Sequence, residues 1–137
     1  MKKILFTLLL VLFTVPLLAN AGVVGKGLKC EGEYYPSKDR DYPYFIYFKD
    51  ELVGRNLVVV GEVISERDLK YWLKGPNKIK IKGIIHGSYS FINRESLELS
   101  FSSGSFYSFT CSVFHSYENL RLEVQKLIDE RTKKNKL

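Results

Sequence analysis

The sequence contains few of the residues on which catalysis and metal binding commonly depend. Its two histidines, His86 and His115, stand far apart in the chain and form no metal-ligand spacing such as H-E-x-x-H. No G-x-S-x-G motif surrounds any of its many serines, and no glycine-rich phosphate loop is present. We therefore expect a protein that is not an enzyme and that uses neither a cofactor nor a metal. We also expect no nucleic-acid partner.

Long apolar stretches are equally scarce, and only one stands out. Residues 4–19 follow two lysines, contain a proline, and lead into Ala19-Asn20-Ala21. With 16 positions, this stretch is short for a membrane-spanning helix. A basic start, a short apolar middle and an Ala-x-Ala end together predict a cleavable secretory signal peptide over residues 1–21. The alternative is an uncleaved membrane anchor.

Cleavage at this point would leave residues 22–137, which are 116 of the 137 residues and enough for a single domain. The formal charge would fall from +6 to +4, because two lysines leave with the signal. We expect this domain to be periplasmic or secreted, with no transmembrane segment after cleavage. The sequence leaves its oligomeric state open.

Cysteine is as rare as histidine, and the two copies are Cys30 and Cys111. Both fall on the apolar side of an alternating segment, so both are expected to point inward. In an exported chain, two cysteines predict a disulfide rather than a catalytic or metal-binding pair. The bridge would close a loop of 82 residues, and chain-entropy arguments give such a loop roughly 4–5 kcal/mol. The alternative is two buried free thiols.

Most of the remaining chain has the alternating pattern of half-buried strands. The clearest case is residues 96–102, where Leu97, Leu99 and Phe101 alternate with serine and glutamate. We expect a turn over residues 50–56, which contain Gly54. Strands are predicted at residues 28–35, 44–48, 57–64, 78–87, 88–93, 96–102 and 105–111. Gly61 within one of them predicts a bulge or a bend.

Residues 65–75 fit two structures. As a helix, the segment would begin at the capping pair Ser65 and Asp68 and end at Gly75-Pro76. As a strand, it would place Leu69, Tyr71 and Leu73 inside, and Gly75-Pro76-Asn77 would turn it into the strand that follows. We favour the strand, because aromatic residues cluster here and the connection stays short.

The period changes near the end of the chain. From Ser116 onward, apolar residues recur at the spacing of an amphipathic helix, which we expect over residues 117–132. Its apolar positions, expected to be buried against the sheet, are Leu120, Val124, Leu127 and Ile128. The predicted fold is mainly β: a small antiparallel barrel or curled sheet of seven to eight strands, with a C-terminal helix packed on it.

Positive charge gathers in one region of the chain. Residues 69–94 contain six basic side chains and no acidic one, whereas residues 31–68 contain nine acidic and five basic ones. Alternation with isoleucine puts Lys78, Lys80 and Lys82 on one face of one strand. If residues 65–75 form a strand, Lys70, Trp72 and Lys74 join that face. We expect these six residues to bind anionic groups. The alternative is a solvated lysine surface that keeps an exposed sheet soluble.

Two other features bear on function. Tyr44 to Phe48 is a continuous apolar run, which predicts a strand covered on both sides or lining a cavity. A cavity lined by Tyr44, Ile46 and Phe48 would favour carriage of small apolar ligands. An exposed loop that enters a partner's cleft would instead favour inhibition of a protein.

Two resemblances point the same way. Cys30-x-Gly32, the hairpin from Tyr89 to Leu99 and a closing Cys111 resemble small exported bacterial β proteins to which no activity is assigned. Trp72-Leu73-Lys74-Gly75 is similar to a segment of the C-type lysozyme inhibitors of the bacterial periplasm, which are small disulfide-bridged β-barrels. The stretch that precedes this tryptophan in those inhibitors has no counterpart here. We therefore expect non-catalytic binding of anionic envelope material or small ligands, with a protein-binding inhibitor as the alternative.

Overall fold

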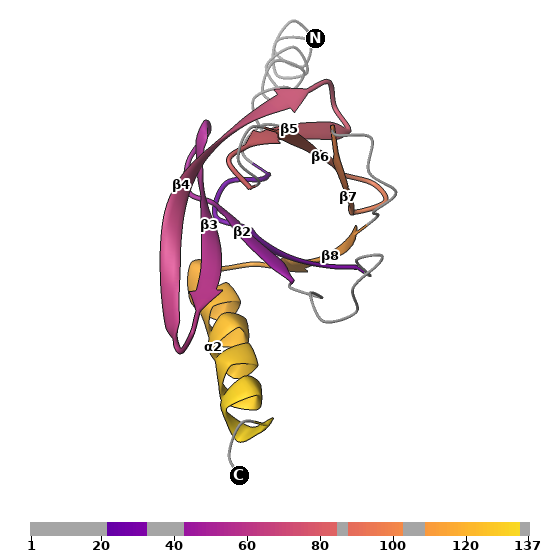
Figure 1. Ribbon diagram of the computed structural model, residues 1–137. Coiled ribbons are helices and arrows are strands. Elements are labelled where there is room, and N and C mark those ends of the chain that lie inside the picture. The colour runs from indigo at the N-terminus through magenta and orange to yellow at the C-terminus, as the bar shows by residue number, and fades with distance from the viewer. Residues whose placement is uncertain (1–21, 33–42, 85–87, 103–108, 135–137) are drawn as a thin grey trace, which may run out of the picture.

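The computed structural model describes residues 22–32, 43–84, 88–102 and 109–134. The predicted signal peptide lies outside the described residues, as does Tyr107 of the last predicted strand. The described chain forms a closed barrel of eight antiparallel strands with one helix on its outside, which confirms the predicted fold class (Figure 1). No helix among these residues has the length and apolar character needed to cross a membrane.

The strands follow one another around the barrel in chain order, each paired with the next, and the last pairs with the first. The elements are β1 (Gly27–Glu31), β2 (Tyr44–Phe48), β3 (Val53–Val60), β4 (Val63–Lys74), β5 (Lys78–Lys82), β6 (Tyr89–Asn93), β7 (Glu98–Phe101), β8 (Phe109–Phe114) and α2 (Tyr117–Lys134). The predictions at residues 44–48, 88–93 and 96–102 agree with β2, β6 and β7 to within two residues at each end.

Two predictions next to β3 are wrong: the turn before this strand and the point at which the strand ends. The expected turn over residues 50–56 ends at Leu52, because the Asp50 carboxylate accepts the N–H groups of Leu52 and Val53 at 3.2 and 3.0 Å. The expected single strand over residues 57–64 is instead the tip of a hairpin. The chain reverses at Gly61, whose φ of +64° lies in the region that glycine tolerates best. Valines on both sides of Gly61 hide this reversal in the sequence.

The strand interpretation of residues 65–75 is confirmed, and these residues form most of β4. Leu69 and Tyr71 are buried while Lys70 and Trp72 are exposed, which is the alternation of a strand. This segment pairs with β3 on one side and, from Lys70 onward, with β5 on the other. The strand therefore satisfies its backbone groups through its neighbours and buries Leu69 and Tyr71 on one face.

Four other boundaries differ from the prediction. β1 ends at Glu31 rather than at residue 35. β5 ends at Lys82, earlier than expected, and Gly83 follows it with a φ of +117°. β8 continues three residues past Cys111 to Phe114, and α2 extends to Lys134 rather than to residue 132.

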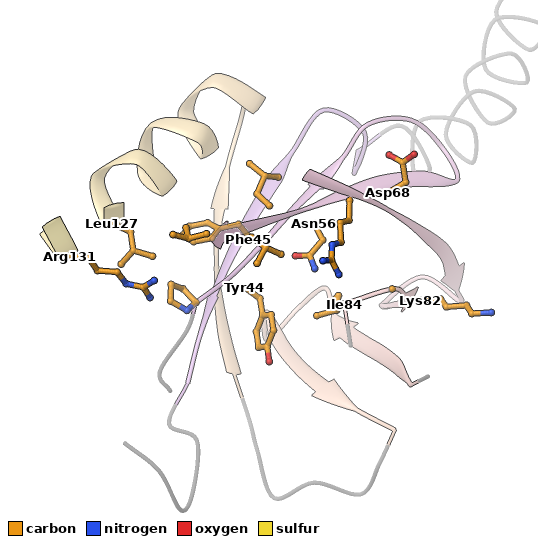
Figure 2. A pocket seen from close by; sticks show the side chains of 14 residues that line it. Tyr44, Phe45, Asn56, Asp68, Lys82, Ile84, Leu127 and Arg131 are labelled. Atoms are coloured by element: carbon orange, nitrogen blue, oxygen red, sulfur yellow. The ribbon is translucent and has the colours of Figure 1, made fainter. Parts of the chain in front are cut away.

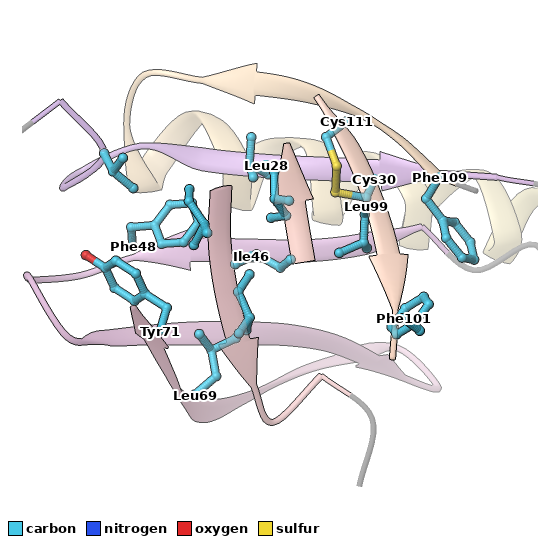
Figure 3. Packing of buried hydrophobic residues seen from close by; sticks show 14 residues of the cluster. Leu28, Cys30, Ile46, Phe48, Leu69, Tyr71, Leu99, Phe101, Phe109 and Cys111 are labelled. Atoms are coloured by element: carbon cyan, nitrogen blue, oxygen red, sulfur yellow. A yellow bond between two sulfur atoms is a disulfide. The ribbon is translucent and has the colours of Figure 1, made fainter. Parts of the chain in front are cut away.

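The barrel is filled by inward apolar side chains from every strand except β3 (Figure 3). Fully buried members include Ile46 of β2, Ile81 of β5 and Leu99 of β7. Cys30 and Cys111 are partners in the β1–β8 register and form the predicted disulfide, so the bridge lies where the barrel closes. The core is thus packed side chains rather than an open channel.

The helix α2 lies on the outer surface of β1, β2, β3 and the first half of β4 (Figure 1). Ser116 caps it by accepting the N–H of Asn119 at 3.1 Å. As predicted, Leu120, Val124 and Ile128 are buried. Leu127 is only partly buried, contrary to the prediction, because it lies at the edge of this cluster.

Gly27 of β1 marks the closest approach of this helix to the barrel. A Cβ at this position would lie 2.8 Å from Cδ2 of Leu120, which is closer than side chains tolerate. The outer surface beneath α2, called the covered face below, thus depends on a glycine at this position.

Charged side chains at the border of the covered face are paired. Lys29 contacts Glu123 of the helix at 2.8 Å and Glu31 of its own strand at 3.1 Å. The Glu66 carboxylate accepts hydrogen bonds from Tyr117 of the helix and, at 3.2 Å, from Arg55 of β3. These contacts fix the helix to the barrel at two places.

Candidate functional site: an outward lysine face

The hairpin of β4 and β5 brings all six predicted site residues onto one outward surface. The register makes them three cross-strand pairs: Lys70 with Lys82, Trp72 with Lys80, and Lys74 with Lys78. Adjacent partners in an antiparallel pair have Cβ atoms about 5 Å apart. Five ammonium groups and one indole therefore share a small area, as the sequence predicted.

The next strand enlarges this surface. Tyr89, Phe91 and Asn93 of β6 are the register partners of Lys82, Lys80 and Lys78, respectively. Three rows of three residues result, one row along each strand. We call the following nine residues the lysine face: Lys70, Trp72, Lys74, Lys78, Lys80, Lys82, Tyr89, Phe91 and Asn93.

The packing of the barrel interior determines which side chains point outward here. Ile79 and Ile81 of β5 and Ile92 of β6 are buried with at most 3% of their surface exposed. Because side chains alternate along a strand, burial of these residues forces their neighbours onto the outer surface. A one-residue slip of β5 would drive its lysines into the core, so the register is strongly fixed.

The turn at one end of the hairpin is fixed as well. Gly75 adopts a φ of +69° in the Gly75-Pro76-Asn77 turn, as the sequence indicated. The backbone N–H of Arg94, in the β6–β7 turn, donates to the carbonyl of Asn77 at 2.7 Å. The Arg94 guanidinium also donates to the carbonyl of Pro76 at 3.2 Å. These bonds hold the β4–β5 turn against the β6–β7 turn, and thereby the three strands of the face.

Aromatic rings lie directly under the lysine ammonium groups. Nζ of Lys80 is 4.1 Å from the centroid of the Tyr89 ring, and Nζ of Lys78 is 5.3 Å from that of Phe91. Exposed contacts of this kind stabilise by ~0.5–1 kcal/mol each. They offset part of the repulsion between adjacent lysines, which would otherwise oppose this arrangement.

No lysine of this face forms an ion pair with a carboxylate anywhere in the described residues. The nearest acidic positions on the outer surface flank it: Asp68 precedes Lys70 on β4, and Glu98 lies on β7. Trp72 and Tyr89 are 38% and 37% exposed, so both rings can contact a bound molecule. The surface is cationic, partly aromatic and accessible.

The contribution of β6 was not predicted from the sequence. Its burial pattern places Tyr89 and Phe91 outside while Ser90 is fully buried. Hydrophobicity alone would assign the opposite orientation, with the rings inside and the serine outside. The available signal was register: strands that pair directly with a lysine-bearing strand place their outward residues beside it.

The aromatic strand β2 was predicted either to be covered on both sides or to line a ligand cavity with Tyr44, Ile46 and Phe48. Ile46 and Phe48 are buried in the packed core, with 0% and 2% exposed. Tyr44 instead lines a pocket of about 780 Å³ at one end of the barrel (Figure 2). The strand is covered on both sides, as predicted, because Phe45 packs against the helix cluster.

The described residues contain no group of three or more histidine, cysteine, aspartate or glutamate side chains that could hold a metal. His115 is exposed between β8 and α2, and His86 lies outside the described residues. Fold and site therefore define the molecule as a disulfide-closed, eight-stranded antiparallel barrel with one helix-covered face and one cationic face. Comparisons with protein-family models, curated proteins and solved structures found no match to this chain.

Proposed function

We propose that this protein is a non-catalytic binding protein of the periplasm or the extracellular space that holds anionic envelope material on the lysine face. The observation that carries the proposal is the register of β4, β5 and β6, which gathers five lysines and three aromatic rings without a carboxylate. The disulfide supports an oxidising compartment. Phosphate and carboxylate groups suit the ammonium groups, and sugar rings or lipid headgroups suit the exposed indole and phenol.

The test compares two double variants that change the net charge equally. Lys78→Glu with Lys80→Glu reverses charge at the centre of the lysine face. Lys126→Glu with Lys134→Glu does the same on exposed positions of α2, away from that face. We expect the first variant to lose binding to vesicles of acidic phospholipid and to lipopolysaccharide, and the second to keep most of it. Both variants should stay folded, as circular dichroism can check, because these side chains lie at the surface.

The salt dependence of binding and the fluorescence of Trp72 test whether the ligand is held on the lysine face. Binding should weaken steeply with ionic strength, because exposed charges are screened over ~8 Å at physiological salt. Trp72 is the only tryptophan of the chain and lies within the face, so binding there should change its emission. Equal binding by both double variants, or binding without a change in emission, would show that the lysines only solvate the sheet.

A second function is favoured by the hairpin of β3 and β4. β2 and β5 pair with only part of these strands, so residues 58–69 extend past both neighbours (Figure 1). Val60 and Val63 at the tip are 59% and 67% exposed. A protruding apolar tip fits the cleft of a protein, as in an inhibitor. Inhibition of a C-type lysozyme that is abolished in Val60→Asp with Val63→Asp would support this function, and absence of inhibition by the parent protein would exclude that target.

A further inference from the structure

A pocket of about 780 Å³ lies at the end of the barrel where β2 begins and β3 and β4 continue beyond it. Its volume is within the range of small-molecule sites. Residues of β2, β3, β4 and α2 line it, among them Tyr44, Asn56, Val58, Arg67, Leu127 and Arg131. Two of its lining residues, Tyr44 and Ile84, also pack against the barrel core. Of the lysine face, the pocket contacts only Lys82.

The polar part of this pocket is Asn56 and Arg67, which are register partners on β3 and β4. Asn56 is 4% exposed, and among the described residues Ser90 is the only other buried polar one. No hydrogen bond joins the Asn56 side chain to another described residue, and its amide is not among the buried atoms without a partner, which are Nε of Arg55 and Oγ of Ser90. Its polar atoms therefore remain accessible from the pocket that Asn56 lines. A ligand in the pocket can form hydrogen bonds with them.

Arg67 gives the pocket its charge. Its side chain is exposed and forms no ion pair within the described chain, although Asp68 is its neighbour in sequence. Asp68 occupies the opposite side of the strand, where its carboxylate lies 3.9 Å from Nε of Arg55. Figure 2 shows Asp68 and Lys82 pointing away from the pocket and Arg131 approaching from the helix. The charged group available to an occupant is thus the guanidinium of Arg67.

The rest of the wall is apolar. Val58 and Val59 of β3, Ile84 after β5 and Leu127 of the helix line it. Figure 2 shows Leu127 and Ile84 on opposite sides, with Asn56 between them. A planar guanidinium binds carboxylate and phosphate groups through two parallel hydrogen bonds. Such an anionic group beside an apolar wall defines an amphipathic ligand.

We propose that this pocket binds a small amphipathic anion, whose carboxylate or phosphate group contacts Arg67 and Asn56 and whose apolar body lies along Val58 and Leu127. The site is independent of the lysine face. The shared chemistry is a single anionic group on an apolar chain, and a fatty acid or an alkyl phosphate could each supply it.

The experiment titrates the full disulfide-bonded protein with dodecanoate, dodecyl phosphate and dodecanol, each below its aggregation concentration, by isothermal calorimetry. We expect saturable binding of at least one anion and much weaker binding of the alcohol. Arg67→Gln should weaken binding of that anion roughly tenfold or more, because a charge-assisted hydrogen-bond pair is lost. Lys126→Gln, which removes one exposed cation of α2 outside both the pocket lining and the lysine face, should leave the affinity unchanged. The stronger of the two anions identifies the headgroup.

Each contrary result is informative. No saturable binding of either anion, or equally tight binding of dodecanol, would overturn the proposal. The same holds if Arg67→Gln binds as the parent does while its urea midpoint is unchanged. Loss of binding in Lys78→Glu with Lys80→Glu, together with a change in Trp72 emission, would move the ligand to the lysine face and count against the pocket.

Discussion

The two outer faces of the barrel differ in whether their charged side chains are paired within the protein. On the covered face, Lys29 is paired with Glu31 and Glu123, and Glu66 receives Arg55 and Tyr117. On the lysine face, five cations share one area, and the described chain supplies no carboxylate to any of them. The same strand, β4, contributes to both: its first half lies under the helix and its second half faces outward.

The paired charges of the covered face stabilise the fold, whereas the charges of the lysine face are available to a binding partner. A charge at the edge of a packed surface is partly desolvated, so it needs a partner within the protein. A charge in water needs none, and repulsion among like charges is a cost that folding alone gives no reason to accept. The covered face should therefore govern stability and the lysine face binding, and four measurements test this division.

The largest effect should come from the disulfide that closes the barrel beneath both faces. Replacing Cys30 and Cys111 by serine should lower the free energy of unfolding by roughly 4–5 kcal/mol, because the unfolded chain regains the freedom of a long loop. Urea unfolding followed by circular dichroism measures this loss. Intact mass after alkylation under non-reducing conditions is the control. Two labelled thiols in freshly isolated protein would contradict the bridge.

The next effect separates the two sides of the helix. Leu120→Ala should cost about 2–5 kcal/mol, because Leu120 is fully buried against Gly27 and its loss leaves a cavity. Leu122→Ala is the matched control, since Leu122 is 67% exposed on the same helix and should change stability by less than about 0.5 kcal/mol. Equal urea midpoints for the two variants would mean that the helix is not docked on the barrel.

A smaller effect concerns the paired charges of the covered face. The hydrogen bond from Lys29 holds the pKa of Glu123 below its ordinary value of 4.5. Burial opposes the charge of Lys29, yet its hydrogen bonds to Glu123 and Glu31 outweigh this and raise its pKa above 10.5. The stabilisation is therefore complete between pH 4.5 and 10.5. It is lost as pH falls through the lowered pKa of Glu123, or rises through the raised pKa of Lys29.

Comparison with Lys29→Met tests this window. At neutral pH the parent should be more stable by ~1 kcal/mol or less, because both side chains remain partly exposed. The difference should vanish in acid as Glu123 becomes protonated. Lys80→Met on the lysine face is the control and should show no such dependence, since Lys80 has no carboxylate partner. A difference for Lys29→Met that persists in strong acid would contradict an electrostatic origin.

The smallest effect lies beneath the lysine face. Ser90 of β6 is fully buried, and its hydroxyl has no hydrogen-bond partner among the residues that the structure describes. Ser90→Ala should leave stability unchanged or raise it by up to about 1 kcal/mol, because an unsatisfied polar group is removed. Binding to anionic vesicles should stay the same. A clear loss of stability would show that the hydroxyl has a partner in solution, such as a bound water.

The alternation of apolar and polar residues was enough to predict the class of fold. The inward positions of the two cysteines predicted the disulfide, and the helical spacing after Ser116 predicted the helix. These patterns failed between Leu57 and Ile64, where apolar residues continue through a reversal and only Gly61 marks it. On β4 and β5, the alternation of side chains correctly predicted that six residues share one outward surface. It did so because lysine and isoleucine differ strongly in hydrophobicity. No side-chain orientation was predicted for β6, whose rings point outward while Ser90 points inward.

The barrel-end pocket was beyond sequence reasoning for another reason. Asn56 and Arg67 become neighbours only through the β3–β4 register, which depends on where the hairpin turns. The predicted single strand over residues 57–64 contained no turn, so their pairing could not follow.

The three rows of three residues on the lysine face also fix the spacing of the backbone positions that carry its charges. Alternate residues along a strand are about 7 Å apart, and neighbouring strands are about 4.8 Å apart. A sheet cannot change either distance without breaking its hydrogen-bond ladder. A flexible polyanion can bring its charges to these positions, whereas a rigid one can do so only if its repeat matches. Discrimination among anionic polymers should therefore follow the distance between their charges rather than their total charge.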